Sequence, residues 1–281
     1  MIGFRVMTED DLGFFMKLMD MVGWGMTPGD YERILRFSPD GTFLAEEAGE
    51  ELGMVVTVNF GDIAWIGNLV VQPETRGRGI GAALLQHAID YLESTGTKSI
   101  RLDGVPRAVP LYRRLGFRDE YWSLRYTGTA TRHSENTCKP MMKENLGAVS
   151  ELDLSVFKAP RREILEYVYG LNPELCFTAY NCDELGGYIM AKHGKDNVKI
   201  GPWIVKPGYA EQAEKLLYSV MNQCVGSKIW VGVPEGNGSS VKILEKLGFD
   251  ALPSSLRMCY GDCSVVEDVK CVYGLGGPDK G

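Results

Sequence analysis

A strand, a glycine-rich loop and a helix follow one another in residues 66–92, and this succession constrains the fold more than any other feature of the chain. Leu69, Val70 and Val71 form a short apolar run rich in β-branched residues, which predicts a strand. The loop at residues 76–81 reads Arg-Gly-Arg-Gly-Ile-Gly. Beyond the loop, apolar residues recur at the spacing of an amphipathic helix: Leu84, Leu85, Ala88, Ile89 and Leu92.

The loop has the chemistry of a pyrophosphate site. Glycines let the backbone approach phosphate oxygens, and the free N–H groups and dipole of a helix N-terminus favour the negative charge. Arg76 and Arg78 add cationic donors suited to phosphate. A dinucleotide-binding loop would begin directly after the strand, but residues 72–75 intervene, and the Gly-Lys-Ser/Thr of a P-loop is absent. The remaining alternative is a surface turn before a structural helix.

The spacing Arg76…Gly79…Gly81, preceded by Val-Val-Gln-Pro-Glu at residues 70–74, resembles the acetyl-coenzyme A loop of the GNAT superfamily of N-acetyltransferases. The resemblance implies an α/β fold with a mixed sheet, of the acyl-CoA N-acyltransferase type, and acetyl-CoA as cosubstrate. It also implies cofactor contacts from the strand and the loop. The residues expected to make them are Leu69, Val70, Val71, Arg76, Gly77, Arg78, Gly79, Ile80, Gly81 and Ala82.

Residues 111–117, Leu-Tyr-Arg-Arg-Leu-Gly-Phe, predict a short helix that glycine ends. Taken alone, Tyr112 reads as a packed aromatic residue. The segment resembles the corresponding one of GNAT proteins, and this implies that Tyr112 is the general acid that protonates the thiolate of coenzyme A. Many family members carry an asparagine seven residues before this tyrosine. The chain has Val105 there, so we expect the loop around the substrate to differ from that pattern.

The chain before the loop predicts a strand, two helices and an antiparallel meander. The helices are expected at residues 12–21, with Thr8 as N-cap, and from Pro28 to Phe37. The strands are expected at residues 4–7, 42–46, 51–60 and 63–71, with a parallel strand at 98–103. The resemblance implies that the first helical region forms one wall of the acceptor site. Trp24 and Asp30 are therefore candidate substrate contacts, and Trp24 alternatively anchors its loop.

The sequence does not single out the general base. Carboxylates lie on several suitable segments, and an ordered water can relay the proton instead. His87 is expected as a solvated or capping residue of its helix, and the isolated His133 and His193 suggest no metal site. The carboxylate candidates are Asp30, Glu46, Glu47, Asp62 and Asp103.

The second half of the chain repeats the first. Gly53, Gly67 and Pro73 recur 134 positions later, and Leu115-Gly116-Phe117 recurs 132 positions later, which indicates a duplication. We therefore expect a GNAT domain at residues 1–128, a polar linker at 129–145 and a degenerate GNAT-like domain at 146–281. The second copy lacks the chemistry, because residues 207–215 form no glycine cradle and Leu244 stands where Tyr112 does.

The composition of the chain limits the kinds of partner that we expect it to bind. The net charge of -7 argues against a nucleic-acid-binding surface. The seven cysteines are odd in number and form no Cys-x-x-Cys pair, so neither a disulfide framework nor a zinc site is indicated. No segment reads as a signal peptide or a membrane span, and we expect a cytoplasmic protein without a membrane partner.

Together these patterns predict an acetyl-CoA-dependent N-acetyltransferase in which a primary amine attacks the thioester directly in a ternary complex. The acceptor is a small molecule or the lysine or N-terminus of a protein, no metal is needed, and the chain is a monomer or homodimer. One alternative is an acyl-CoA-binding sensor without turnover. Another is that the second half recruits a protein acceptor. The sequence leaves open which amine is acetylated.

Overall fold

The computed structural model of the chain describes residues 2–134 and 138–281. They form two compact units. The first consists of Met1–Asp119, Met258–Cys263 and Pro278–Gly281, and the second of Glu120–Arg257 and Ser264–Gly277. The units are not contiguous in sequence, so the domain bounds at 1–128 and 146–281 stay a prediction. The linker expected at 129–145 includes residues 135–137, which lie outside the described residues.

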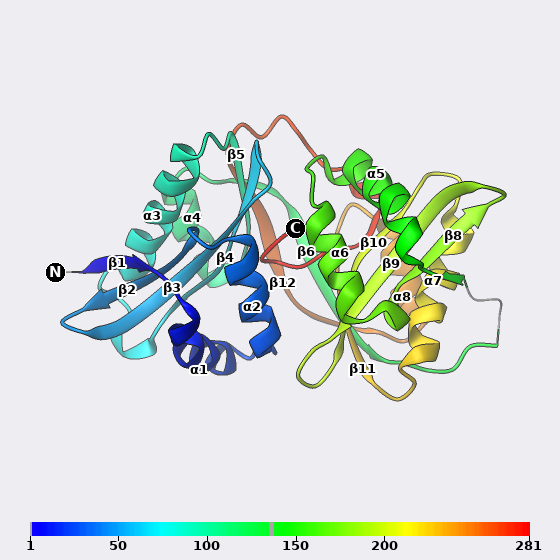
Figure 1. Ribbon diagram of the computed structural model, residues 1–281, viewed down its shortest axis with the longest axis horizontal. Helices are drawn as coiled ribbons and strands as arrows, with labels where there is room; N and C mark the ends of the chain where they lie inside the picture. Colours follow the sequence, from blue (N-terminus) through cyan, green and yellow to red (C-terminus); the bar gives the residue numbers. More distant parts are fainter. Residues whose placement is uncertain (1, 135–137) are drawn as a thin grey trace. The chain divides into compact units, whose positions relative to one another are not determined.

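The first unit is a mixed sheet with helices on both faces (Figure 1). Its strands follow the order β1-β2-β3-β4-β5-β12, antiparallel from β1 to β4 and parallel between β4 and β5. The α/β fold class is confirmed, and so are the predicted helices and strands. Their bounds are β1 (Gly3–Val6), α1 (Leu12–Val22), α2 (Pro28–Phe37), β2 (Thr42–Glu47), β3 (Glu50–Asn59), β4 (Ile63–Val71), α3 (Ile80–Ser94), β5 (Ser99–Gly104), α4 (Val109–Arg114) and β12 (Asp250–Gly261).

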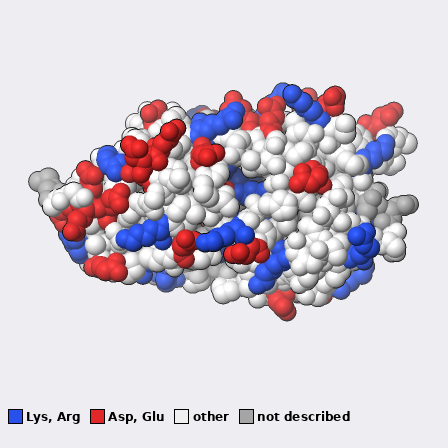
Figure 2. Space-filling model, turned by 60° about the horizontal axis from the view of Figure 1, so that its bottom comes forward, with Lys and Arg blue, Asp and Glu red and all other residues white. Residues whose placement is uncertain are grey.

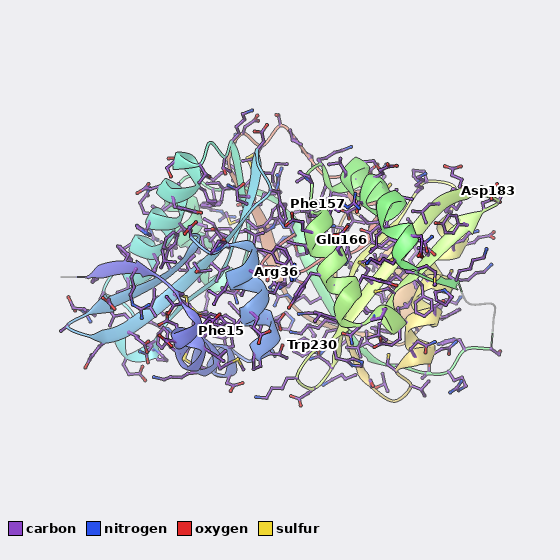
Figure 3. The ribbon with its side chains drawn as sticks, viewed as in Figure 1. Phe15, Arg36, Phe157, Glu166, Asp183 and Trp230 are labelled. Carbon is purple, nitrogen blue, oxygen red and sulfur yellow. A yellow bond between two sulfur atoms is a disulfide. The ribbon has the colours of Figure 1, made fainter. Side chains whose placement is uncertain are left out.

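Side-chain alternation along β2 divides the core of this unit into two layers. Leu44 joins the buried cluster formed with α1 and α2. Its neighbour Phe43 faces the other way and makes an edge contact with Tyr91 of α3, with ring centroids 5.2 Å apart. Within the first layer, the buried Phe15 of α1 packs on Tyr31 of α2 at 4.7 Å between centroids (Phe15 is labelled in Figure 3). The two helices thus share one hydrophobic layer with the sheet.

Two expectations from the sequence are wrong. His87 is not a solvated or capping residue, because its ring stacks on Phe4 at 4.8 Å between centroids and meets the edge of Phe43 at 4.5 Å. Cys259 and Cys263 form a disulfide at a Cys-x-x-x-Cys spacing that the count of cysteines did not indicate. β12 ends at Gly261, between these two residues.

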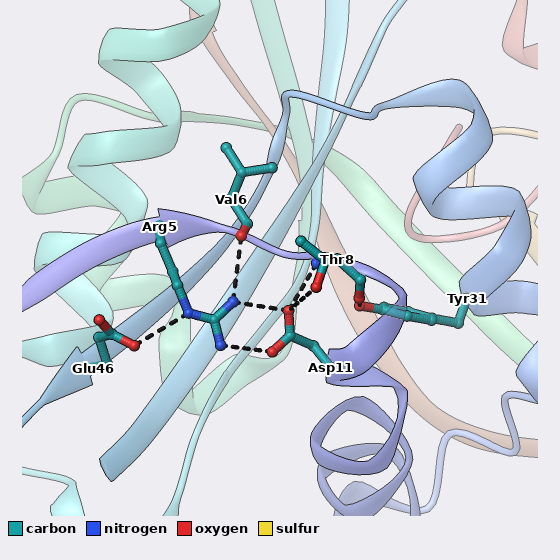
Figure 4. Close-up of polar contacts among 6 residues, drawn as sticks. All are labelled: Arg5, Val6, Thr8, Asp11, Tyr31 and Glu46. Atoms are coloured by element: carbon teal, nitrogen blue, oxygen red, sulfur yellow. Dashed lines mark hydrogen bonds and ion pairs between the residues drawn. The ribbon is translucent and has the colours of Figure 1, made fainter. Parts of the chain in front are cut away.

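A buried carboxylate holds the start of α1 (Figure 4). Asp11 accepts hydrogen bonds from two nitrogens of Arg5, at 2.6 and 2.8 Å, and from the backbone N–H of Thr8 at 2.7 Å. Arg5 also pairs with Glu46 at 3.1 Å, and the Tyr31 hydroxyl donates to the carbonyl of Thr8. The hydrogen bond from Arg5 lowers the pKa of Asp11 despite the opposing effect of burial. This cluster joins β1 to α1 and α2.

We predict that Asp11→Asn lowers the free energy of unfolding at pH 7 by about 2 kcal/mol, because charged hydrogen bonds are lost. A carboxyl group with a lowered pKa in the fold contributes stability above its ordinary pKa of 3.8 and loses it as the pH falls. The difference between wild type and variant should therefore shrink below pH 4. Urea unfolding at pH 7 and at acidic pH measures it, and a pH-independent difference would contradict the assigned role.

The second unit repeats the succession of helices and strands. Its sheet follows the order β12-β6-β11-β10-β9-β8-β7, and β13 pairs with β10. The repeat predicted from the constant offset is thus confirmed by the order of elements. Their bounds are β6 (Arg118–Thr129), β7 (Lys139–Pro140), α5 (Leu146–Phe157), α6 (Arg162–Leu171), β8 (Phe177–Asn181), β9 (Glu184–His193), β10 (Val198–Val205), α7 (Ala210–Gln223), β11 (Lys228–Pro234), α8 (Gly238–Lys246) and β13 (Val272–Gly274).

A buried ion pair ties α5 to the loop before α6. Two nitrogens of Arg161 donate to the carboxylate of Asp153, both at 2.8 Å, and the guanidinium lies 3.6 Å from the centre of the Phe157 ring (Phe157 is labelled in Figure 3). The Tyr188 hydroxyl also donates to Asp153. The buried carboxylate and guanidinium neutralise each other and are hydrogen-bonded. We therefore infer that the cluster has a structural role.

Charges on the face drawn in Figure 2 are mixed, with Lys and Arg interspersed among Asp and Glu. Exposed ion pairs of this kind include Arg113–Asp119 and Arg162–Glu166, at 2.5 and 2.7 Å. Such pairs typically contribute less than about 1 kcal/mol each to stability. Because the two signs are interspersed, the face drawn in Figure 2 shows no broad area of one charge.

Candidate active site

A bulge in β4 begins the candidate site. Met54 pairs with Val70 and Val56 pairs with Gly67, so Asn68 and Leu69 together face only Val55. Asn68 has a φ of 51°, and its side-chain amide reaches the sulfur of Met26 at 2.9 Å. Its buried side chain fixes the bulge against the helical layer of the first unit.

The bulge coincides with the point where β4 leaves β5. Parallel pairing between the two strands runs from Ile63 opposite Ser99 to Trp65 opposite Arg101, and stops there. Among the described residues, no strand pairs with the rest of β4 on this side. The strand residues predicted as cofactor contacts, Leu69, Val70 and Val71, lie on this stretch. An extended ligand with amide groups can add to such an edge as a further strand.

The loop after β4 is shaped by two glycines in the left-handed region. Gly77 has φ 80° and Gly79 has φ 81°, and Gly79 is the N-cap of α3. A Cβ at either position would meet no atom within 4 Å, so the space above the loop is open. Backbone conformation, and not crowding, therefore requires glycine here.

The backbone N–H groups from Gly77 to Ala82 form no hydrogen bond to any described residue, and the first turn of α3 begins with that of Ala83 donating to Gly79 at 3.0 Å. The N–H of Arg76 is already used, since it donates to Pro73 at 3.3 Å. Its side chain donates to the carbonyl of Val71 at 3.1 Å. The unpaired row at a helix N-terminus is suited to anionic oxygens.

Arg78 is an exposed residue of the same loop and pairs with Glu47. The hydrogen bond from Arg78 lowers the pKa of Glu47. The pairing holds the guanidinium beside the open face of the loop. Both predicted loop arginines thus lie next to the unpaired N–H groups, although each already has a partner within the protein.

Tyr112 lies at the carboxyl end of β5. A Cβ on Gly104, the last residue of β5, would stand 2.8 Å from the Tyr112 ring, so the ring rests on bare backbone. The edge of Phe117 supports it at 6.1 Å between centroids. Burial raises the pKa of Tyr112 to about 12, although the nearby Arg107 cation opposes the shift. Its hydroxyl forms no hydrogen bond to the residues that the structure describes and stays protonated at neutral pH.

All five carboxylates considered as general base have partners. Asp30 caps α2, accepting from the N–H and hydroxyl of Thr27 at 3.0 and 3.1 Å. Glu46 pairs with Arg5, Glu47 with Arg78, and Asp62 with Lys98. Asp103, on β5, also takes part in an interaction. These side chains therefore have structural roles to which any catalytic role would be added.

The two predicted substrate contacts belong to α2 and to the loop before it. Trp24 is half-buried and packs against the hydrophobic cluster of α1 and α2. Asp30 is buried, with its carboxylate used in the cap of α2. Both positions suit an anchor of this helical region, and their contact with a substrate stays a prediction.

An open cavity of ≈ 530 Å³ lies on the β3 side of the end of β4. Glutamates dominate its lining, together with Arg5, Gln72 and Thr75. Carboxylates repel phosphate, and this cavity faces away from the unpaired edge of β4, which lies on the β5 side. We do not assign cofactor binding to it. The lining glutamates are Glu46, Glu50, Glu51 and Glu74.

The equivalent place in the second unit is closed. β10 has a matching bulge at Gly201 and Pro202, and its parallel pairing with β11 ends at Ile200. Beyond this point β13 pairs with β10, at Trp203 opposite Gly274, so the edge is already taken. α7 begins without a glycine cradle and has the acidic Glu211 in its first turn. The second copy thus lacks both the free edge and the anion site.

One buried charged residue of the first unit was not predicted from the sequence. Arg33 of α2 is only 2% exposed and donates to the carboxylate of Asp279, at the far end of the chain. The signal was available in part, because Arg33 lies beside Ile34 on the buried side of an amphipathic helix. Nothing in the pattern indicated its partner.

This geometry defines a class of protein, and comparison with known families agrees. The model described as "Acetyltransferase (GNAT) family" matches residues 11–117, and that described as "Acetyltransferase (GNAT) domain" matches residues 149–274. The two matches together span most of the chain. The chain therefore belongs to the GNAT acetyltransferases, with two GNAT domains in tandem, and is an acyltransferase of the acyl-CoA-dependent type.

Individual relatives are more distant. The chain is 25% identical over 248 residues to holothin acyltransferase of Pseudoalteromonas sp. (strain SANK 73390), which covers 85% of this chain and 81% of that protein. It is 30% identical to an uncharacterized N-acetyltransferase of Methanocaldococcus jannaschii, over 41% of this chain and 60% of the relative.

Solved structures show the same fold. A candidate acetyltransferase from Pyrococcus horikoshii has a TM-score of 0.85 at 24% identity, covering 100% of this chain and 96% of that one. A tandem GNAT protein from the clavulanic acid biosynthesis pathway has a TM-score of 0.66 at 16% identity, covering 93% of this chain and 98% of that one. At these identities the likeness concerns the fold alone.

Two structural findings concern membranes and metals. Across residues 2–134 and 138–281, no helix combines the length and apolar character needed to cross a membrane. Within the same residues, His, Cys, Asp and Glu side chains form no group of three or more that could hold a metal ion.

Proposed function

We propose that the first unit transfers an acetyl group from acetyl-CoA to a primary amine. The observation that carries this proposal is the row of unpaired N–H groups from Gly77 to Ala82, which follows the unpaired edge of β4 with only residues 72–76 between them. An anion site joined to a free strand edge matches the two ends of a molecule with a pyrophosphate and an amide-bearing arm.

Each predicted contact has a place in this scheme. Leu69, Val70 and Val71 would hold the pantetheine amides through their backbone groups. The N–H groups of Gly77, Arg78, Gly79, Ile80, Gly81 and Ala82 would bind the pyrophosphate, assisted by the side chains of Arg76 and Arg78. Acetyl-CoA supplies an activated acyl group as a thioester. The backbone conformation already present at Gly77 and Gly79 means that little of the loop has to rearrange.

The chain's own groups then provide the proton and the electrostatics. The N–H of Leu69 or Val70, next to the bulge, would polarise the thioester carbonyl. The amine nitrogen forms a bond to the carbonyl carbon as the carbon–sulfur bond breaks. Tyr112 would donate its proton to the departing sulfur, and its pKa of about 12 keeps that proton available at neutral pH. The proton of the ammonium leaves through ordered water, because the neighbouring carboxylates are engaged.

The acceptor is an amine, and the names of relatives include enzymes for a protein acceptor and for a small-molecule acceptor. One relative is a ribosomal protein bS18-alanine N-acetyltransferase and another a glucosamine 6-phosphate N-acetyltransferase, each matched over about a quarter of this chain or less. Protonated Tyr112 favours an enzyme over a sensor, since a sensor needs no proton donor.

Thiol release from acetyl-CoA tests the function. Purified protein should be assayed against separate pools of amino acids, polyamines, aminoglycosides and lysine peptides, with propionyl-CoA as a second donor. We expect acceptor-dependent release with one pool and faster turnover of acetyl-CoA than of propionyl-CoA. Binding of acetyl-CoA without release in any pool would favour the sensor instead.

A further inference from the structure

Arg33 is an unusual buried cation, because most of its donors are unused. The side chain is 2% exposed, and its Nη2 donates to Asp279. Its Nε and Nη1 have no hydrogen-bond partner among the described residues. Buried guanidinium groups normally have their donors satisfied, so two idle nitrogens indicate a missing partner.

The partner that is present comes from the segment Pro278–Gly281, which belongs to the first unit. Asp279 is 7% exposed, and the backbone of this segment lies directly on β4. A Cβ added to Gly67 would stand 2.7 Å from the Cα of Asp279. Lys280 then pairs with Asp279 at 2.9 Å, on the carboxylate oxygen that does not face Arg33.

This contact lies close to the point along β4 where its pairing with β5 ends. Gly67 comes two residues after Trp65, where the parallel pairing of β4 ends, and one residue before the bulge. Strand residues rise by about 3.3 Å each, so even across the bulge Gly67 lies within roughly 7 Å of Leu69, beside which the thioester would be held. An acidic side chain of the chain itself thus fills the space next to the proposed reaction centre.

We propose that Arg33 binds the carboxylate of the acceptor, which makes the acceptor an amino acid, and that Asp279 occupies this carboxylate position when the acceptor is absent. The inference rests on the proposed acetyltransferase function and adds the substrate class. A guanidinium presents paired N–H groups that match a carboxylate, and once Asp279 leaves Nη2, the idle Nε or Nη1 can complete such a pair with it. Asp279 lies against Gly67, within roughly 7 Å of Leu69 along the strand, and this spacing suits an amine several bonds from the carboxylate, as in lysine.

Pairs of acceptors that differ only in the carboxylate test the proposal: lysine with cadaverine, and ornithine with putrescine. We expect the wild-type protein to acetylate the amino acid of at least one pair with a KM about tenfold below that of its decarboxylated partner. In Asp279→Ala the KM for that amino acid should fall further by about threefold to tenfold, because the internal competitor is gone. The KM for the partner should stay within about twofold.

Arg33→Met should raise the KM for the amino acid by at least about tenfold and remove the preference over the decarboxylated partner, with kcat at saturation within about threefold. Asp90→Ala is the matched control, since it removes an exposed carboxylate of the same unit that accepts a hydrogen bond from Gln86, at 2.7 Å. This control should leave every KM unchanged.

Thermal unfolding gives a readout that does not depend on turnover. Asp279→Ala leaves Arg33 without its partner, so lysine should raise the melting temperature of this variant, whereas cadaverine at equal concentration should not. Lysine should have no such effect on Arg33→Met. Equal effects of lysine and cadaverine in both assays would overturn the substrate class, even if amines are acetylated. Selective stabilisation by lysine without any thiol release would instead retain the carboxylate site and refute the acetyltransferase function.

Discussion

Replacing Tyr112 by Phe should lower kcat by about 100-fold or more while the dissociation constant of acetyl-CoA changes little. The substitution removes only the hydroxyl, and the ring keeps its contacts with Gly104 and Phe117. General acid catalysis by a positioned side chain is typically worth two to four powers of ten in rate, about 100-fold to 10,000-fold. Stopped assays of kcat, together with calorimetric titration of acetyl-CoA, measure the two quantities.

Tyr260→Phe is the matched control for this variant. Tyr260 packs on Phe117 in the same aromatic cluster, with ring centroids 5.4 Å apart, but its hydroxyl donates to Glu93 at 3.0 Å. The control should keep its kcat. If Tyr112→Phe also kept its kcat within about twofold, the general acid would have to be another group.

The dependence of the rate on pH tests the same assignment of Tyr112 as the general acid. A tyrosine whose pKa is raised to about 12 loses its proton only in strongly alkaline solution. The rate should therefore rise with pH as the acceptor amine loses its proton, and it should show no fall due to the enzyme below about pH 11. A fall centred near the ordinary tyrosine pKa of 10.0 would contradict the raised value. Profiles of kcat from pH 6 to about 10.5 are sufficient, because a fall centred near 10 already shows there.

Replacing Gly79 by Glu should weaken acetyl-CoA binding by at least about 100-fold. Gly79 has φ 81° and caps α3, so any side chain strains the loop, and a carboxylate at this position opposes the pyrophosphate. Calorimetric titration gives the dissociation constant directly. Circular dichroism shows whether the variant is folded.

Gly208→Glu is the control for the location of the site, because it introduces the same backbone strain and the same charge in the second unit. Gly208 has φ 88°, is exposed and precedes α7 in the second unit as Gly79 precedes α3 in the first. The control has the same substitution at a glycine whose φ also lies in the left-handed region. We expect it to bind acetyl-CoA as the wild type does, and equal loss of binding in both variants would contradict a site confined to the first unit.

Much of the first unit could be predicted because its signals are local. The apolar run before the loop, the glycines at 77 and 79 and the helical spacing after them fix strand, loop and helix within a short stretch. The helix from Pro28 to Phe37 was predictable for the same reason, since Pro28 and Asp30 are start signals. The duplication was predictable because glycines at bulges recur at a constant offset.

Long-range contacts could not be predicted. Arg33 and Asp279 are 246 positions apart, and no local preference indicates that such residues meet. The closure of the second unit depends on β13, a strand too short to give a pattern. The disulfide between Cys259 and Cys263 depends on the geometry at the end of β12, which the spacing alone does not reveal.

The part that the sequence predicted least well is the acceptor side of the site. Trp24 and Asp30 were chosen because their helical region lines this side in related folds, yet in the structure both serve to anchor or cap α2. Arg33, on the same helix, has the idle donors that a ligand needs.

The stoichiometry of acetyl-CoA binding tests the central claim most directly, namely that one working acyltransferase site lies in the first unit and that the second unit has lost its own. Calorimetric titration of the full chain should give one acetyl-CoA per chain, with binding abolished in Gly79→Glu and retained in Gly208→Glu. Two molecules per chain, or one molecule that still binds to Gly79→Glu, would contradict the claim.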